Sequence, residues 1–219
     1  MVRVPLGDQI ALAIRADILL GRLKPGEHLS QQQICERFGT SRIPVRDAFN
    51  ALLHEGFVTE AVGHRVVVAR STRQDLSDIY MIEGLLHGIA ARRAAEHITV
   101  DELEELRALH RQFKSAVESN QEEDIAALNW EFHRRLNQMA DSPRLLAALR
   151  PLATCIPRDI VSVLPRFGVK AVTAQRQMLQ ALKVGDGEVA ERIMVGYVNE
   201  AGADLIEYLD GQRVTSESG

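Results

Sequence analysis

The sequence predicts a mainly α-helical protein in which a small N-terminal domain with one β-hairpin precedes an antiparallel helical bundle. Two observations carry this prediction. Apolar residues recur at helical spacing along most of the chain, whereas FVTEAVGHRVVVAR has two β-rich runs around a turn. With 219 residues, of which 46% are apolar, the chain can form packed cores in one large or two modest domains.

No apolar run approaches the roughly 20 residues of a membrane-spanning helix, and the N-terminus has no hydrophobic segment of the signal-peptide kind. We therefore expect a soluble cytoplasmic protein. Cys35 and Cys155 lie in helix-like apolar patterns, which favours two buried thiols over a disulfide or a zinc site. The formal charge of −4 is uneven, because residues 1–70 carry +2 and residues 71–219 carry −6. This asymmetry weakly favours an anionic partner at the N-terminal domain.

The first two helices are predicted from apolar spacing and from capping residues. In QIALAIRADILLGRLKPGE the apolar residues follow a helical period as far as Gly21. Ser30 then opens SQQQICERFG, where Gln33 three residues later gives the form of a capping box. Gly39 marks the end of this short helix.

A third helix is predicted over SRIPVRDAFNALLHEG, with Ser41 as its N-cap. Pro44 is tolerated because the first turn of a helix has N–H groups without an intrahelical partner. One face of this helix is apolar and consists of Val45, Ala48, Phe49 and Leu52. Another face is polar and consists of Arg42, Arg46 and Asn50. Both arginines thus point away from the core.

The order helix, helix, turn, helix and hairpin is that of a winged helix-turn-helix, which reads DNA with the first turn of its third helix. Arg42 and Arg46 lie in that turn, where arginine can grip guanine in bidentate fashion. His64 and Arg65 would lie at the hairpin tip, near the minor groove or the backbone. The alternative is that these arginines form only a solvated surface.

The stretch from about Ile10 to Val68, with SRIPVRDA inside it, resembles the DNA-binding domain of GntR-type bacterial transcription regulators. This resemblance implies DNA contacts by Ser41, Arg42 and Arg46, a phosphate or base contact by Gln32, and a wing turn at Gly63. The wing departs from the family, which often has an Arg-Gly pair where this chain has Gly63, His64 and Arg65.

From residue 72 onward the pattern is helical throughout, which predicts a domain of residues 71–212 after a first domain of residues 1–70. Residues 213–219 are expected to form a disordered tail. The predicted helices cover 72–97, 100–118, 122–140, 142–155, a piece around 157–164, 167–184 and 186–209.

Polar residues lie on the apolar faces of these helices. Asn129 and His133 fall in one stripe, and Gln175 and Tyr197 each fall in another. Glu83 and His87 border a fourth stripe, made of Ile79, Ile82, Leu86 and Ala90. One such residue alone would be an ordinary core polar group with a partner, but several from four helices predict a polar cavity.

NWEFHRRLNQMADSPRLL is similar to a segment of the FCD ligand-binding domain in the FadR/VanR branch of GntR regulators. Many members hold a divalent metal there with one aspartate and three histidines. Only His133 matches, because Asn129, Gln175 and Tyr197 take the other three positions. Two amides and a phenol supply neither the charge nor the donor strength for tight binding, so we expect no cofactor. A rearranged site that uses His87 and Glu83 is the alternative.

Together these features predict a homodimeric transcription regulator, a repressor that binds a palindromic DNA operator and responds to a small organic effector. The effector, with a hydroxyl, amide or carboxylate group, would contact residues of the cavity, with Arg150 as a further candidate. Two other classes remain: an enzyme with His133 or His87 as general base, and a helical adaptor that binds protein. Neither explains the N-terminal domain as well, so we expect no enzyme.

Overall fold

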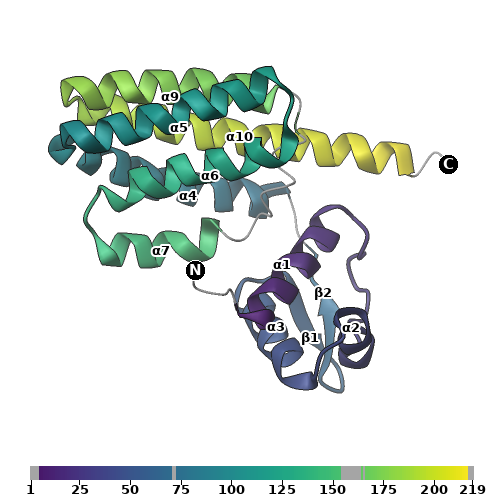
Figure 1. Cartoon of the computed structure of the whole chain (residues 1–219). Coiled ribbons are helices and arrows are strands. Elements are labelled where there is room, and N and C mark those ends of the chain that lie inside the picture. The colour runs from purple at the N-terminus through teal and green to yellow at the C-terminus, as the bar shows by residue number, and fades with distance from the viewer. Residues whose placement is uncertain (1–4, 71–72, 154–163, 165, 217–219) are drawn as a thin grey trace. The chain divides into compact units, whose positions relative to one another are not determined.

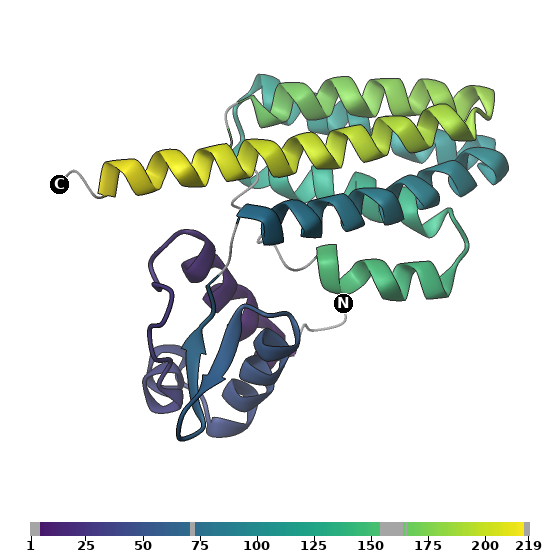
Figure 2. The same cartoon turned by 180° about the vertical axis from the view of Figure 1, so that it is seen from behind.

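A computed structural model describes residues 5–70, 73–153, 164 and 166–216, with side chains as far as residue 211. Its contacts divide the chain into two compact units. The first, here called the winged unit, extends to Arg73. The second, the helical unit, includes Gln74–Ala153 and the last helices as far as Asp210. Figures 1 and 2 show the elements of each unit from opposite sides.

The winged unit contains the elements that the sequence predicts, in the predicted order. Its helices are α1 (Leu6–Leu19), α2 (Gln31–Phe38) and α3 (Arg42–His54), and its strands are β1 (Val58–Ala61) and β2 (Arg65–Val68). The strands pair antiparallel, with Val58 opposite Val68 and Ala61 opposite Arg65. Helix α3 packs against α1, α2 and β1 (Figure 1). The prediction of a winged helix-turn-helix is confirmed.

The core of the winged unit lies between α1, α3 and the hairpin, and it is built from fully enclosed aliphatic side chains. These include Ile10, Ile14, Val45, Leu52 and Val68. The apolar face predicted for α3 is buried, and Arg42 and Arg46 are exposed. Burial of this face fixes the roll of α3 about its axis, so the opposite face is the one that meets solvent.

The helix ends follow the capping signals with one exception. The Ser30 hydroxyl accepts a hydrogen bond from the Gln33 amide at 3.4 Å, and Gly39 closes α2 in the left-handed conformation at φ 59°. Ser41 occupies the N-cap position of α3, but its side chain makes no capping hydrogen bond. The predicted N-cap position of Ser41 is therefore confirmed, although its hydroxyl makes no bond to the first turn of α3.

Two ion pairs join the three helices of the winged unit. Arg15 on α1 forms a bidentate pair with Glu55 beyond the end of α3, with N–O distances of 2.5 and 2.7 Å. Asp17 on α1 accepts from Arg37 on α2 at 2.5 Å. The side chains of Arg15 and Asp17 are each only 6% exposed, so these pairs are largely shielded from solvent.

The helical unit is a bundle of long helices, as predicted. It contains α4 (Arg73–His97), α5 (Val100–Glu118), α6 (Glu122–Gln138), α7 (Pro143–Ala153), α9 (Phe167–Val184) and α10 (Gly187–Ser216). Helix α5 packs against both α6 and α9. Thr99 and Glu102 form a complete capping box at the start of α5. The hydrogen bonds from Thr99 lower the pKa of the Glu102 carboxyl.

Several boundaries differ from those predicted. Helix α10 continues to Ser216 rather than ending at 209, so its backbone includes residues 213–216 of the segment expected to be a disordered tail. The piece predicted around 157–164 lies outside the described residues, apart from the buried Leu164, as does Cys155. Cys35 is half-buried rather than fully buried.

The inner face of α4 also differs from the prediction. The sequence placed Ile82 in the inward stripe, but its side chain is 46% exposed. Ala90 of that stripe is buried as predicted, and the rest of the buried face includes Leu76, Tyr80, His87 and small residues such as Gly84 and Gly88. These glycines let α10 approach closely, because a Cβ atom at Gly88 would lie 2.7 Å from Val195 Cγ2.

Candidate DNA interface and effector site

The N-terminal turn of α3 presents the polar residues predicted to contact DNA. Ser41, Arg42 and Arg46 are all exposed there. Gln31 Nε2 donates to the Arg42 carbonyl at 3.2 Å, which ties the start of α2 to the start of α3. The unpaired N–H groups of this turn and the helix dipole add to the attraction for phosphate.

The arginines of the winged unit fall into two groups. Arg15 and Arg37 are held in the ion pairs described above, and Arg22 shares Asp17 with Arg37 at 3.2 Å. Arg42 and Arg46, by contrast, form no ion pair within the described part of the chain. An arginine already paired with a shielded carboxylate must give up that partner to bind DNA, whereas a free one need not. The free arginines are therefore the ones positioned to bind.

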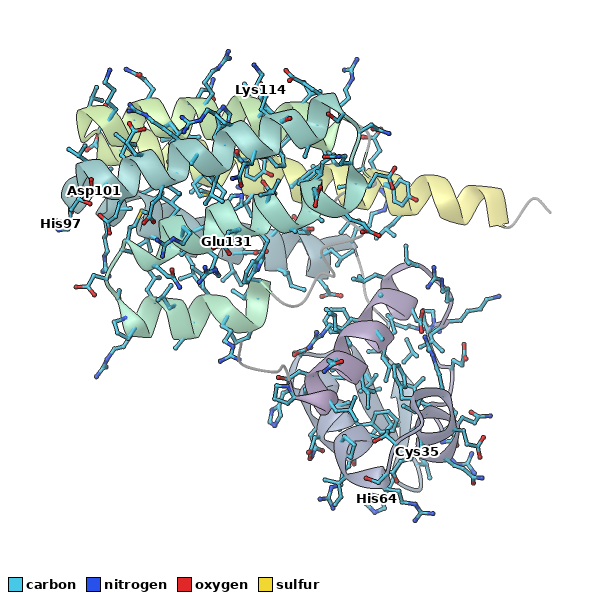
Figure 3. All side chains as sticks on the ribbon, in the orientation of Figure 1. Cys35, His64, His97, Asp101, Lys114 and Glu131 are labelled. Carbon is cyan, nitrogen blue, oxygen red and sulfur yellow. The ribbon has the colours of Figure 1, made fainter. Side chains whose placement is uncertain are left out.

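The hairpin turn supplies a second exposed polar surface. Gly63 and His64 form the turn with φ of 80° and 56°, and Arg65 follows as the first residue of β2. All three are exposed, and Figure 3 shows His64 at the edge of the winged unit. His64 Nδ1 lies 3.8 Å from the Glu60 carboxylate. Gln32, the α2 candidate, is also exposed, and its amide donates to Glu36 at 3.0 Å.

Inside the helical unit, four polar side chains form one hydrogen-bonded chain across four helices. Gln175 on α9 donates to Asn129 Oδ1 on α6 at 3.2 Å, and Tyr197 on α10 donates to the same oxygen at 3.3 Å. His110 on α5 lies with Nδ1 3.1 Å from Gln175 Oε1. Since an amide oxygen only accepts, His110 is the donor in this contact.

His133 lies beside this chain in an enclosed position. Its ring stacks on Tyr197, with centroids 5.4 Å apart and planes 12° apart, and meets His87 edge-on at 5.6 Å. Nδ1 of His133 is buried, and none of the described residues gives it a hydrogen bond. Burial, and secondly the neighbouring His87, lower the pKa of His133 to about 3. His133 is therefore neutral at physiological pH.

His87 is the other enclosed histidine, and both of its ring nitrogens have partners. Nδ1 lies 3.1 Å from Asn137 Oδ1 on α6, and Nε2 lies 3.4 Å from Glu83 Oε1 one turn away. Glu83 and His87 are thus brought to the cluster as predicted. They point inward rather than only bordering the apolar stripe, because the side chains are 14% and 6% exposed.

A small cavity adjoins His133, with a volume of about 10 Å³. Its lining is partly polar and partly apolar: Phe132, His133, Ala174, Gln175, Met178, Ile193, Met194 and Tyr197. A space of this size holds about one water molecule. Arg150 does not belong to the lining, since it is an exposed residue of α7. The structure thus brings six of the seven predicted effector residues into one cluster and leaves Arg150 outside.

Three residues of this cluster were missed from the sequence. His110 lies in the buried stripe of α5 with Leu106 and Phe113, so the spacing test that found Gln175 would have found it. Asn137 follows His133 by four residues on the same helix face. Tyr80 lies on the buried face of α4, and burial raises the pKa of its hydroxyl.

The four positions that hold a metal in many FCD domains do not suit one here. His133 is the one imidazole among them, and Asn129 Oδ1 already accepts two hydrogen bonds. The described residues contain no group of three or more His, Cys, Asp or Glu side chains that could hold a metal ion. In the rearranged alternative, His87 Nε2 lies 3.4 Å from Glu83 Oε1 and its Nδ1 is occupied by Asn137 Oδ1, so this pair offers two ligands.

The fold and the exposed arginines define a winged helix-turn-helix protein with a helical C-terminal domain. Comparison with known protein families identifies both domains. Residues 6–68 match the family model "Bacterial regulatory proteins, gntR family", and residues 78–200 match the model of the FCD domain. The chain belongs to the GntR family of bacterial regulatory proteins and carries an FCD domain. The resemblances noted in both halves of the sequence are thereby confirmed, and the family consists of regulators rather than enzymes.

Individual relatives agree with this family. An uncharacterized HTH-type transcriptional regulator of Mycobacterium tuberculosis is 31% identical over 151 residues, which are 69% of this chain and 61% of that protein. The chain thus spans about three fifths of the length of that relative. A probable D-xylose utilization operon transcriptional repressor of Paenarthrobacter nicotinovorans is 28% identical, over 90% of this chain and 88% of that protein.

A solved structure supports the fold alone. Escherichia coli McbR/YncC superposes with a TM-score of 0.71 at 23% identity, over 94% of this chain and 99% of that one. Within the described residues, no helix is both long enough and apolar enough to cross a lipid bilayer.

Proposed function

We propose that this protein is a homodimeric transcription regulator that binds a palindromic operator through α3 and releases it in response to a small organic effector. One observation carries the proposal: in a GntR-family chain, Arg42 and Arg46 extend from the start of α3 without an ion pair to any described residue. The first turn is the part of a recognition helix that enters the major groove. Gln32, Ser41, Gly63, His64 and Arg65 would complete the contact surface.

An exposed apolar stripe on α4 supports the dimer. Met81, Ile82, Leu85 and Ile89 follow one another at helical spacing and are 37% to 49% exposed. Such a stripe on a soluble domain is typical of a protein interface. A second copy of the chain would cover it, and two winged units related by a two-fold axis suit two half-sites of a palindrome.

The buried polar cluster supports the effector. Two buried polar atoms of the cluster, His133 Nδ1 and the Tyr80 hydroxyl, have no hydrogen-bond partner among the described residues, which costs stability and supports a site for a bound molecule. An effector acts only by binding one state of the dimer more tightly than the other. A coupling of about 1–3 kcal/mol would change the operator affinity by about 5- to 150-fold.

Repression is the direction we propose for this control. The relative from Paenarthrobacter nicotinovorans is described as a probable transcriptional repressor, and the two chains align over 90% of this one. A dimer that binds its operator without effector blocks transcription by occupying the site, and effector binding then relieves the block.

Arg46→Ala tests the DNA-binding surface. Loss of a bidentate guanine contact costs about 1–3 kcal/mol, so we expect operator affinity to fall by about 5- to 150-fold, with loss of the specific footprint. The measurement is a gel shift and footprint on DNA from upstream of the gene, at several salt concentrations. Circular dichroism should show an unchanged helix content.

Arg22→Ala is the matched control, since Arg22 is an exposed arginine of the same unit that neighbours Asp17. It should leave operator affinity within about twofold, because it removes no base contact. A footprint that persists in the Arg46 variant, or one that disappears equally in both variants, would contradict the assignment of α3 as the reading helix.

A further inference from the structure

The interior around His133 contains polar atoms that the protein itself leaves unused. His133 Nδ1 and the Tyr80 hydroxyl are both buried, and neither has a hydrogen-bond partner among the described residues. The two lie in one neighbourhood, because Tyr197 stacks on His133 and also acts electrostatically on Tyr80. Buried polar atoms of this kind are stabilised when a bound molecule supplies the missing bond.

The charge around these atoms disfavours an anion. Glu83 places a carboxylate beside His87 and close enough to Tyr80 to raise the pKa of its hydroxyl. The described residues that line the cavity include no lysine or arginine. His133 is neutral, since burial lowers its pKa to about 3. A carboxylate, which only accepts hydrogen bonds, would meet a like charge near the inner cavity, whereas the basic side chains of Arg166, Lys170 and Arg192 line a separate surface groove between α9 and α10.

A hydroxyl group matches the same surroundings. It both donates and accepts, so it can bond His133 Nδ1 in either tautomer and the Tyr80 hydroxyl in either role. Asn129 Oδ1 and Gln175 Oε1 add acceptors at the edge of the cluster. Several hydroxyl groups on one molecule could thus replace internal hydrogen bonds that break when the ligand enters.

A groove on the surface shares part of its lining, including Tyr197, with this interior. The groove runs between α9 and α10 and has a volume of about 670 Å³, which lies in the range of small-molecule sites. Ala174, Ile193 and Tyr197 line both the groove and the inner cavity. Space beside the neighbouring Gly196 is open. Rotation of the Tyr197 ring away from His133 would therefore join the two spaces.

We propose that the helical unit binds an uncharged, hydroxyl-rich molecule of sugar or polyol size, whose hydroxyl groups bond His133 and its neighbours once Tyr197 has swung toward the α9–α10 groove. This inference rests on the effector role proposed above and narrows it to one chemical class. It differs from a metal-bound carboxylate, for which the donor set does not fit.

Matched pairs of neutral and charged compounds test the proposed chemical class of the ligand. The full-length protein is titrated with xylose, glucose, xylitol and sorbitol, and with the sodium salts of xylonate and gluconate, which have nearly the same size but carry a charge. Binding is followed by thermal shift and by the fluorescence of Trp130, the one tryptophan of the chain, which neighbours Asn129 on α6. We expect at least one neutral compound to bind about tenfold or more tightly than its aldonate.

Variants then locate the bound molecule. His133→Phe keeps a ring against Tyr197 but removes Nδ1, and it should weaken binding by about tenfold. Ala174→Trp narrows the shared wall and should weaken binding similarly, and it provides a second test if the first variant folds poorly. Arg176→Ala, on the exposed face of α9 beside Gln175, is the control and should bind as the parent protein does.

The outcomes distinguish this inference from the regulatory function. Tighter binding of an aldonate, especially if it is lost in Arg192→Ala at the groove, would overturn the neutral class while operator binding persists. Absence of a response to every neutral compound would overturn it as well. If the protein without ligand does not retard specific DNA in a gel shift, the proposed regulatory function is contradicted, whatever the result of the ligand titrations.

Discussion

At the scale of single residues, His133 differs most from an ordinary histidine, because its ring is enclosed between Tyr197, His87 and Phe132. Burial first, and then His87, hold its pKa near 3. In the unfolded chain the same group takes up a proton near pH 6.5. The unfolded state therefore binds more protons than the folded state between these two values, and stability falls as the pH is lowered.

His133→Phe should remove this component of the pH dependence. For the parent protein, His133 alone contributes a loss of up to about 1.5 kcal/mol in the free energy of unfolding between pH 6.5 and pH 5. Over the same pH interval, the free energy of unfolding of the His133→Phe variant should decrease by correspondingly less. Urea titrations at pH 5, 6, 7 and 8 measure the difference between the two slopes.

His97→Gln serves as the control for this measurement, since the side chain of His97 is 75% exposed. It should retain the pH slope of the parent protein. Equal slopes for the parent and the His133 variant would mean that His133 titrates in the folded state much as it does in the unfolded chain.

The sequence identified most residues of the polar cluster, because helical spacing shows which side chains share a face with apolar residues. It placed Asn129, His133, Gln175 and Tyr197 on buried faces, and these residues do lie together. Spacing cannot show which helices meet, however. Arg150 therefore entered the prediction although it is exposed, and Asn137 was missed although it contacts His87.

At the scale of elements, the Arg15–Glu55 pair fixes α1 against the end of α3. Removal of one member of a shielded ion pair leaves the other charge without a partner. Glu55→Ala should therefore lower the free energy of unfolding by about 3 kcal/mol, as measured by urea denaturation of the full chain.

Glu60→Ala provides a comparison in the same unit, because the Glu60 side chain is 58% exposed and faces only His64. It should change stability by less than about 0.5 kcal/mol. Similar values for the two substitutions would indicate that the Arg15–Glu55 pair adds nothing beyond a surface contact.

Helix α10 packs against α4 through positions that tolerate no side chain. A Cβ atom at Gly202 would lie 2.5 Å from Cγ and 2.6 Å from Cβ of Tyr80, and the Cβ atom cannot move unless the backbone of α4 moves. Gly202→Ala should therefore lower the free energy of unfolding by about 2 kcal/mol or more. Thermal unfolding followed by circular dichroism measures the change.

Gly196→Ala is the matched substitution in the same helix, since nothing lies within 4 Å of the Cβ position there. Alanine favours the helix over glycine, so this variant should be more stable by about 0.5–1 kcal/mol. We therefore expect Gly202→Ala to lower the free energy of unfolding and Gly196→Ala to raise it. Equal destabilisation would show that glycine is needed in α10 for a reason other than close packing.

Elements were predicted best where local signals act alone. The hairpin, the Ser30 cap and the Gly39 end of α2 depend on a few neighbouring residues, and each was found in place. The inward face of α4 was assigned wrongly because large aliphatic residues were taken as core. Only the packed structure shows that α10 needs small residues at that contact, which leaves Ile82 outside.

At the scale of the whole molecule, the exposed stripe of α4 leads to a prediction about assembly. Leu85→Glu places a charge in the centre of this stripe, where burial of an unpaired charge would disfavour association. We expect a monomer of normal helix content, with operator affinity reduced by about a hundredfold because the two half-sites are no longer bound by one linked molecule. Sedimentation velocity and gel shifts measure both effects.

Val100→Glu controls for an added surface charge, since Val100 is 78% exposed at the start of α5 and lies apart from the stripe. This variant should keep the oligomeric state and the operator affinity of the parent protein. A Leu85 variant that sediments as the parent protein does would place the dimer interface on another face.

Helix α4 has three faces with three different contacts. His87 and Glu83 face the polar cluster, Gly84 and Gly88 face α10, and Leu85 and its neighbours face solvent. Along the chain, α4 begins five residues after the last residue of β2. A turn of this rod about its own axis by a few degrees would thus alter all three contacts at once. The proposed effector site, the proposed dimer stripe and the connection to the winged unit would then all depend on the orientation of one helix.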